Sequence, residues 1–208
     1  MTVLITGATG LIGQEIVKQC HAQGINVHYL TTSKSKLSTE ANYKGFYWNP
    51  DKNEIDHNCF KDVSAIINLV GASISKRWTD AYKKEILESR TKTAQLLQET
   101  IKTHQYNIDQ VVSASAIGIY PTSLTNYYDE DHKQISESFL GKVVDQWESA
   151  VDGFKTATGL PDFSALPAIS GFASGFFVSD IVFAFVRKGM TLFVSIRSYP
   201  LEFVRSLP

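Results

Sequence analysis

The chain has 208 residues, with 43% apolar and 20% charged side chains and a formal net charge of −1, a composition typical of a soluble globular protein with one sizeable core. The near-neutral charge and the lack of a long basic stretch argue against nucleic acid or an anionic membrane as a partner and favour a small ligand. The two cysteines, Cys20 and Cys59, stand in no Cys/His cluster, so we expect no metal site and a reducing, cytoplasmic compartment.

The first elements alternate between strands and a helix. Thr2–Thr6 is short, β-branched and apolar, which predicts a strand buried on both faces and not a signal peptide. Apolar residues then recur at helical spacing over Leu11–Cys20, and Gly24 predicts the end of that helix. Ile25–Thr31 predicts a second strand, and Gly45–Trp48 predicts a third.

The alternation continues through the first 160 residues. Ser64–Val70 predicts a fourth strand, a long helix is expected from about Asp80 to Lys102, and Gln110–Ser115 predicts a fifth strand. A further helix is expected from Gly141 to Phe154. Strands that alternate with helices at this spacing predict an α/β fold, a Rossmann-like doubly wound parallel sheet.

A glycine run, Gly7-Ala8-Thr9-Gly10-Leu11-Ile12-Gly13, joins the first strand to the first helix. Glycines in such a turn need no ligand to explain them. This run, however, leaves a buried strand and opens an amphipathic helix, so Gly7 can form the tight turn, Gly10 can admit a pyrophosphate, and Gly13 can let the helix pack closely. The N–H groups at the helix start would face that phosphate. We expect dinucleotide contacts from Gly7, Thr9, Gly10, Leu11, Ile12 and Gly13.

The end of the second strand bears on the choice of dinucleotide. An acidic residue there would bind the ribose 2′-hydroxyl and repel a 2′-phosphate. This chain carries Thr32, Ser33 and Lys34 instead, which suit NADP(H) better than NAD(H). The alternative is that the lysines of this segment only solubilise a loop.

Several separate segments resemble the extended short-chain dehydrogenase/reductase superfamily, which implies a nicotinamide cofactor. The Gly-x-x-Gly-x-x-Gly spacing resembles its glycine motif, and Asn68-Leu69-Val70-Gly71-Ala72 resembles its cofactor-lining segment. With Ser89-Arg90 and Ser113–Tyr120, the match resembles the uncharacterised NAD(P)-dependent epimerase-like branch over about residues 1 to 156. The resemblance implies cofactor contacts from Asn68, Gly71, Ala72 and Arg90.

The catalytic pattern of that superfamily is incomplete in this chain. The resemblance makes Ser115 the serine that polarises a substrate oxygen; the alternative is that its hydroxyl bonds only to local backbone. The Tyr-x-x-x-Lys pair is missing: if Trp147-Glu148 aligns with the acidic residue after that pair, Leu140 and Val144 hold its positions. Tyr120 or water is then the expected proton donor.

Two functions remain open from the sequence. One is an NAD(P)-binding epimerase/dehydratase-like oxidoreductase acting on a small substrate, which the retained Ser115 favours. The other is a non-catalytic NADP(H)-binding sensor or regulatory protein, which the loss of the Tyr/Lys pair favours. The substrate and the oligomeric state are not encoded in any motif that we find.

The sequence changes character after about residue 160, where most of the chain's phenylalanines lie. We expect residues 1–160 to form the nucleotide-binding domain and residues 161–208 to be a truncated or frame-shifted remnant of the substrate lobe. Activity would then be impaired. The competing interpretation is a membrane segment over Phe163–Val186, which Pro167 and Asp180 disfavour.

Overall fold

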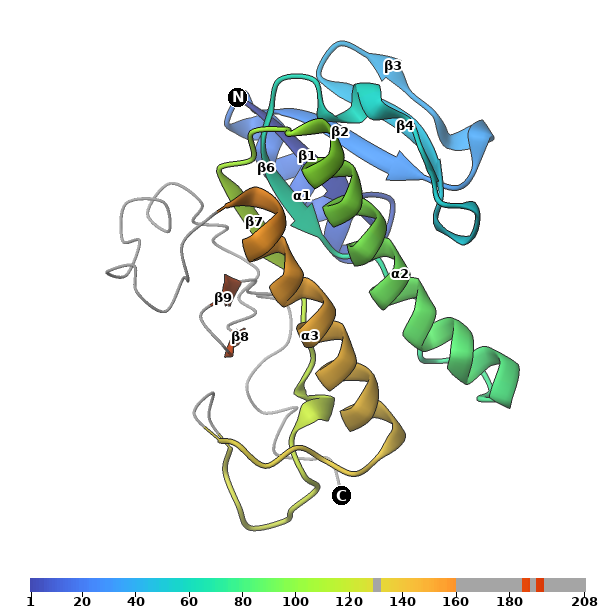
Figure 1. Ribbon diagram of the computed structural model, residues 1–208, viewed down its shortest axis with the longest axis vertical. Helices are drawn as coiled ribbons and strands as arrows, with labels where there is room; N and C mark the ends of the chain where they lie inside the picture. The colour runs from blue at the N-terminus through green and yellow to red at the C-terminus, as the bar shows by residue number, and fades with distance from the viewer. Residues whose placement is uncertain (129–131, 160–184, 188–189, 193–208) are drawn as a thin grey trace.

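Five parallel strands form the centre of the sheet in the computed structural model, which describes residues 1–128, 132–159, 185–187 and 190–192 (Figure 1). In spatial order they are β4 (Tyr43–Asn49), β2 (Asn26–Thr31), β1 (Thr2–Thr6), β6 (Val63–Asn68) and β7 (Gln110–Ser113). The order reverses direction at β1, as in Rossmann-like sheets, and ligands bind such sheets where the order reverses. The predicted doubly wound parallel sheet is confirmed.

Two short strands extend this sheet at its β4 edge. β3 (Thr39–Glu40) and β5 (Glu54–Ile55) both pair with β4 in antiparallel fashion. The connection from β2 to β4 carries only β3 and the 3₁₀ helix η1 (Lys34–Lys36), where the predicted alternation would place a full helix. That stretch is polar and offers no apolar face for packing on the sheet.

In the part of the chain that the structure describes, three α-helices cover the two faces of the sheet. α1 (Leu11–Ala22) lies on one face, and α2 (Asp80–His104) and α3 (Phe139–Thr158) lie side by side on the other (Figure 1). The remaining short helices are η2 (Pro50–Lys52), η3 (His57–Phe60) and η4 (Ile117–Ile119).

Alternation along β1 explains the two-sided core. Leu4 belongs to the cluster that α2 and α3 complete, with Leu97 among its members. Val3 and Ile5 belong to the opposite cluster, with Ile16 of α1. Successive strand residues point to opposite faces, and each fully buried Leu or Ile contributes about 1.5–3 kcal/mol. The uninterrupted apolar run of β1 is therefore the signature of a central strand.

Local capping sets the ends of the two long helices. The Thr79 hydroxyl accepts a hydrogen bond from the Tyr82 N–H at the start of α2, and the Ser138 hydroxyl accepts one from the Gly141 N–H at the start of α3. Gly159 ends α3 with a φ of 67°, a left-handed value that favours glycine. The capping serine makes α3 start before the predicted Gly141.

Beyond α3, the structure describes two short strands, β8 (Phe185–Arg187) and β9 (Met190–Leu192), which pair in antiparallel fashion. The predictions that concern residues 161–208, the remnant of a substrate lobe and the membrane segment, otherwise lie outside the described residues. Within the described part of the chain, no helix combines the length and apolar character that crossing a bilayer requires.

Candidate functional site

A row of buried polar side chains joins the carboxyl ends of β1, β6 and β7. Thr6 Oγ1 donates to Asn68 Oδ1 at 2.7 Å, and Asn68 Nδ2 donates to Ser113 Oγ at 3.0 Å. The three residues are register partners on neighbouring strands. Because buried polar groups are costly when unpaired, this chain of bonds fixes the strand ends from which the site's loops depart. The predicted residue Asn68 therefore acts on the loops from inside the sheet.

The turn after β1 packs directly on the loop after β6. The backbone N–H groups of Leu69 and Val70 both lie within hydrogen-bond distance of Thr6 Oγ1, at 3.1 and 3.3 Å. Gly7 has a φ of +74°, and a Cβ on it would stand 3.1 Å from the Leu69 carbonyl carbon. Glycine is thus required at residue 7 both by its left-handed backbone and by its closeness to the second loop.

Gly10 and Gly13 serve the helix start in different ways. A Cβ on Gly13 would overlap the Gly7 carbonyl oxygen, so Gly13 lets α1 pack against the turn. Gly10, the N-cap of α1, has an extended backbone that any residue can adopt, and a Cβ there would meet only Gly7 O, at 3.3 Å. A small side chain at residue 10 would need Gly7 O to move by a few tenths of an ångström, and the space beyond that one contact is open to a ligand.

The N-terminus of α1 has the properties of an anion site. Its N-cap makes no side-chain hydrogen bond to the helix, and its first turn carries no acidic residue. Leu11 is 85% exposed, Thr9 is exposed and Ile12 is half-buried. Unpaired N–H groups and the positive end of the helix dipole favour a phosphate at such a terminus. The residues present fit the pyrophosphate of a dinucleotide.

The segment after β2 presents hydroxyls and a cation. Thr32 is exposed, and the Ser33 N–H donates to Thr31 Oγ1 at 3.1 Å. Lys34 is exposed, with its Nζ 5.0 Å from the centre of the Tyr47 ring. The arrangement gives the end of β2 a positive character, which suits an anionic group such as a 2′-phosphate.

Arg90 of α2 holds the loop after β6 in place. Its Nη2 donates to the Ala72 carbonyl at 3.2 Å, and its guanidinium lies 5.1 Å from the centre of the Trp147 ring. A Cβ on Gly71 would stand 2.8 Å from Arg90 Cζ, so the glycine admits the guanidinium. Burial lowers the pKa of Arg90 from its ordinary value. The guanidinium stays charged, because that ordinary value lies far above neutrality.

Ser115 bonds to a carboxylate 33 residues away and not to local backbone. Its Oγ donates to Glu148 Oε1 at 2.6 Å, while Glu148 Oε2 is buried without a hydrogen-bond partner among the described residues. Ser115 lies two residues beyond the carboxyl end of β7. The sequence marked Glu148 only as an alignment landmark, because nothing in its local pattern reveals that it reaches Ser115.

Apolar side chains occupy the positions assigned to the missing Tyr/Lys pair. A Cβ on Gly118 would stand 3.3 Å from Leu140 Cβ and 4.0 Å from Val144 Cγ2. Leu140 and Val144 thus pack against the segment that follows Ser115. Tyr120, the other predicted catalytic residue, follows η4 and stacks in parallel with Tyr128 at 5.7 Å.

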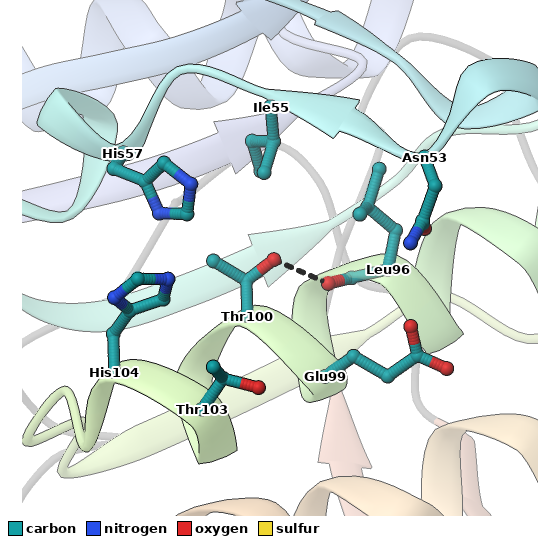
Figure 2. Close-up of a pocket in the computed structure, with 8 residues that line it drawn as sticks. All are labelled: Asn53, Ile55, His57, Leu96, Glu99, Thr100, Thr103 and His104. Atoms are coloured by element: carbon teal, nitrogen blue, oxygen red, sulfur yellow. Dashed lines mark hydrogen bonds between the residues drawn. The ribbon is translucent and has the colours of Figure 1, made fainter.

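A separate hollow lies away from these residues, beside the C-terminal end of α2 (Figure 2). It encloses about 200 Å³, and the rings of His57 and His104 meet there with their centres 4.2 Å apart. Both histidines precede a strand at its amino end, β6 and β7 respectively, opposite the edge described above. Its lining residues are Asn53, Ile55, His57, Leu96, Glu99, Thr100, Thr103 and His104. No residue of the predicted site belongs to it.

Comparison with known proteins gives one family and a set of similar folds. The model of the NAD-dependent epimerase/dehydratase family matches residues 3–139. An epimerase family protein of Staphylococcus saprophyticus is 36% identical over 158 residues, which are 74% of this chain and 50% of that protein. One from Staphylococcus haemolyticus is 31% identical over 173 residues, 81% of this chain and 56% of that protein. The chain thus spans about half the length of the curated relatives it matches.

Solved structures agree on the fold. The human epimerase family protein SDR39U1, solved with NADPH, matches 73% of this chain and 48% of its own, with a TM-score of 0.57 and 27% identity. The UDP-N-acetylglucosamine 4-epimerase of Bacillus cereus matches 77% of this chain and 51% of its own, with a TM-score of 0.59 and 20% identity. The latter similarity supports the Rossmann-like fold alone.

Proposed function

This chain belongs to the NAD-dependent epimerase/dehydratase family, and we propose that it binds NADP(H) at the carboxyl edge of its sheet for oxidoreductase chemistry on a small substrate. The observation that carries the proposal is the start of α1. There Gly10 leaves open space in front of a helix N-terminus that has no side-chain cap and no carboxylate in its first turn. A nicotinamide dinucleotide supplies or accepts a hydride when bound.

In this proposal, different segments of the chain contact different parts of the dinucleotide. The Gly7–Gly13 turn cradles the pyrophosphate, and Thr32, Ser33 and Lys34 receive the 2′-phosphate. Gly71 and Ala72 line the cofactor from the loop after β6, which Asn68 and Arg90 hold in position. The preference for NADPH is supported by these three residues at the end of β2 and by the NADPH in the similar human protein.

Residues 1–160 form the nucleotide-binding domain in this proposal. Relatives are about twice as long as the segment they share with this chain, so the substrate and the reaction of a full-length relative are not assigned to it. The two buried, unpaired cysteines support a cytoplasmic location.

A second function, a non-catalytic NADP(H) sensor, is supported by a specific observation. Leu140 and Val144 pack on Gly118 where the superfamily's acid–base pair would stand. Such a protein would bind the nucleotide and change its affinity for a partner without turnover.

Anaerobic incubation with NADPH and a panel of carbonyl compounds separates the two functions. If the parent chain oxidises NADPH and Ser115→Ala does not, the result supports the enzymatic function. Saturable NADPH binding with no oxidation by any compound supports the sensor. A chain that neither binds nor oxidises NADPH would contradict both functions.

A further inference from the structure

The acid–base group of this site is not where the superfamily's pattern places it. Apolar Leu140 and Val144 fill those positions beside Gly118, and neither can carry a proton. The half-buried side chain of Glu148 lies one turn further along α3 from Val144, and its carboxylate bonds directly to Ser115.

Two features of Glu148 bear on its role. The Ser115–Glu148 distance of 2.6 Å is typical of a hydroxyl donating to a carboxylate. The second oxygen, Oε2, is buried and has no hydrogen-bond partner among the described residues. A buried polar atom left unpaired is costly, and such atoms call for an explanation, of which a catalytic role is one.

We propose that Ser115 and Glu148 form a proton relay that replaces the missing Tyr/Lys pair and accepts a proton from an alcohol substrate. The proposal rests on the proposed nucleotide binding. An ionised carboxylate only accepts hydrogen bonds, so Ser115 directs its single proton to Glu148. The lone pairs of Ser115 Oγ, which accept no hydrogen bond from the described residues, can then accept one from the hydroxyl of a substrate.

The step balances in atoms and electrons. The substrate C–H bond breaks with its electron pair, and the hydride goes to the oxidised nicotinamide. The substrate O–H bond breaks, its proton binds Ser115 Oγ, and the serine proton passes to Glu148 Oε1. The substrate carbon and oxygen form a carbonyl. In the reverse direction, protonated Glu148 returns the proton through Ser115.

Other charged residues lie near Glu148 along α3 and on α2. On α3, Asp145 and Asp152 lie about one turn before and after Glu148, and Asp152 lies 3.7 Å from Lys155. On α2, Arg90 stacks on Trp147 next to Glu148 in the chain. Asp145→Asn is therefore a matched control, because it removes a carboxylate from the same helix without touching the relay.

The test uses trifluoroethanol, an alcohol that donates strong hydrogen bonds and resists hydride loss, as a probe of the substrate hydroxyl. NADP⁺ and NADPH affinities are first measured for the parent chain and for Glu148→Gln, Asp145→Asn, Ser115→Ala and Ser115→Thr. Infrared difference spectra are then recorded when trifluoroethanol is added to each NADP⁺ complex, at concentrations that leave the circular dichroism unchanged. The readout is the shift of a carboxylate stretching band, because a hydrogen bond donated to Ser115 Oγ strengthens the one that Ser115 donates to Glu148.

The relay predicts that this shift appears in the parent chain and in Asp145→Asn and is lost in Glu148→Gln and Ser115→Ala. Ser115→Thr retains a hydroxyl and keeps the shift. A Ser115–Glu148 bond that no substrate hydroxyl reaches would give no shift on addition of an alcohol. If NADP⁺ binds and no such shift occurs, or the shift persists in Glu148→Gln, the relay is overturned and nucleotide binding stands. If no nucleotide binds, the proposed function fails and the relay fails with it.

Discussion

At Gly10, cofactor binding restricts the size of the side chain more than folding does. Its backbone is extended, and a Cβ would meet only Gly7 O, so the free chain has room for a side chain that a pyrophosphate would exclude. We expect Gly10→Val to weaken NADPH binding by on the order of tenfold or more. Fluorescence titration measures the affinity, and circular dichroism checks the fold.

Gly24→Ala is the control for Gly10→Val. Gly24 follows the other end of α1, where its φ of +69° strains any side chain although open space surrounds it. That variant loses stability and keeps its affinity for NADPH. Parent-like NADPH affinity in a folded Gly10→Val protein would contradict the phosphate cradle.

Lys34 tests the choice between the two dinucleotides. Replacing it with glutamate puts a carboxylate where we place the 2′-phosphate, so Lys34→Glu should narrow the ratio of NADPH to NADH affinity severalfold by weakening NADPH. Lys52→Glu makes the same charge change at an exposed position in η2 and should leave the ratio unaltered. An equal effect of both variants would mean that only net charge matters.

At the scale of elements, the buried row of Thr6, Asn68 and Ser113 ties three strands together. Asn68→Ala removes the side-chain hydrogen bonds that join Thr6 Oγ1 and Ser113 Oγ through Asn68, and we expect it to lower the free energy of unfolding by about 1–3 kcal/mol in urea titrations. Asn58→Ala removes an asparagine whose bonds are exposed and should change it by less than about 0.5 kcal/mol. Similar losses in both variants would argue against the row as a structural tie.

The central elements could be predicted because their patterns are strong. β1 has the predicted bounds Thr2–Thr6, and α2 begins at the predicted Asp80. An apolar strand run and a long amphipathic helix each repeat one signal many times. The two-residue strands β3 and β5 were missed, because their pairing with β4 depends on tertiary position and not on any periodicity of their own.

The candidate site shows the same difference between residues with a local sequence signal and residues placed by tertiary structure. The glycine run was predictable, since each glycine answers to local geometry in a strand–turn–helix sequence. Glu148 was not, because its bond to Ser115 joins α3 to the end of β7 across 33 residues. Arg90 donates hydrogen bonds to the carbonyls of Ile86 and Ala72, and its contact with the cofactor stays a prediction.

For the molecule as a whole, ionisation of the two buried thiols makes the free energy of unfolding depend on pH in the alkaline range. Burial raises the pKa of Cys20 from 9.0 to about 11 and also raises that of Cys59. A thiol whose pKa is higher in the folded state stabilises the fold below the unfolded pKa, and that stabilisation disappears as the pH rises through the folded value. We expect the free energy of unfolding to fall between about pH 9 and pH 11. Cys20→Ala should show a shallower fall; an identical slope would remove Cys20 as a cause.

In the proposed function, the carboxyl edge of this sheet binds a nicotinamide dinucleotide and prefers the phosphorylated form. Calorimetric titration of the 208-residue chain with NADPH and with NADH under identical conditions measures both properties. We expect saturable binding of NADPH at one molecule per chain, tighter than that of NADH. Tighter binding of NADH would contradict the reading of Thr32, Ser33 and Lys34, and no saturable binding of either nucleotide would contradict the site itself.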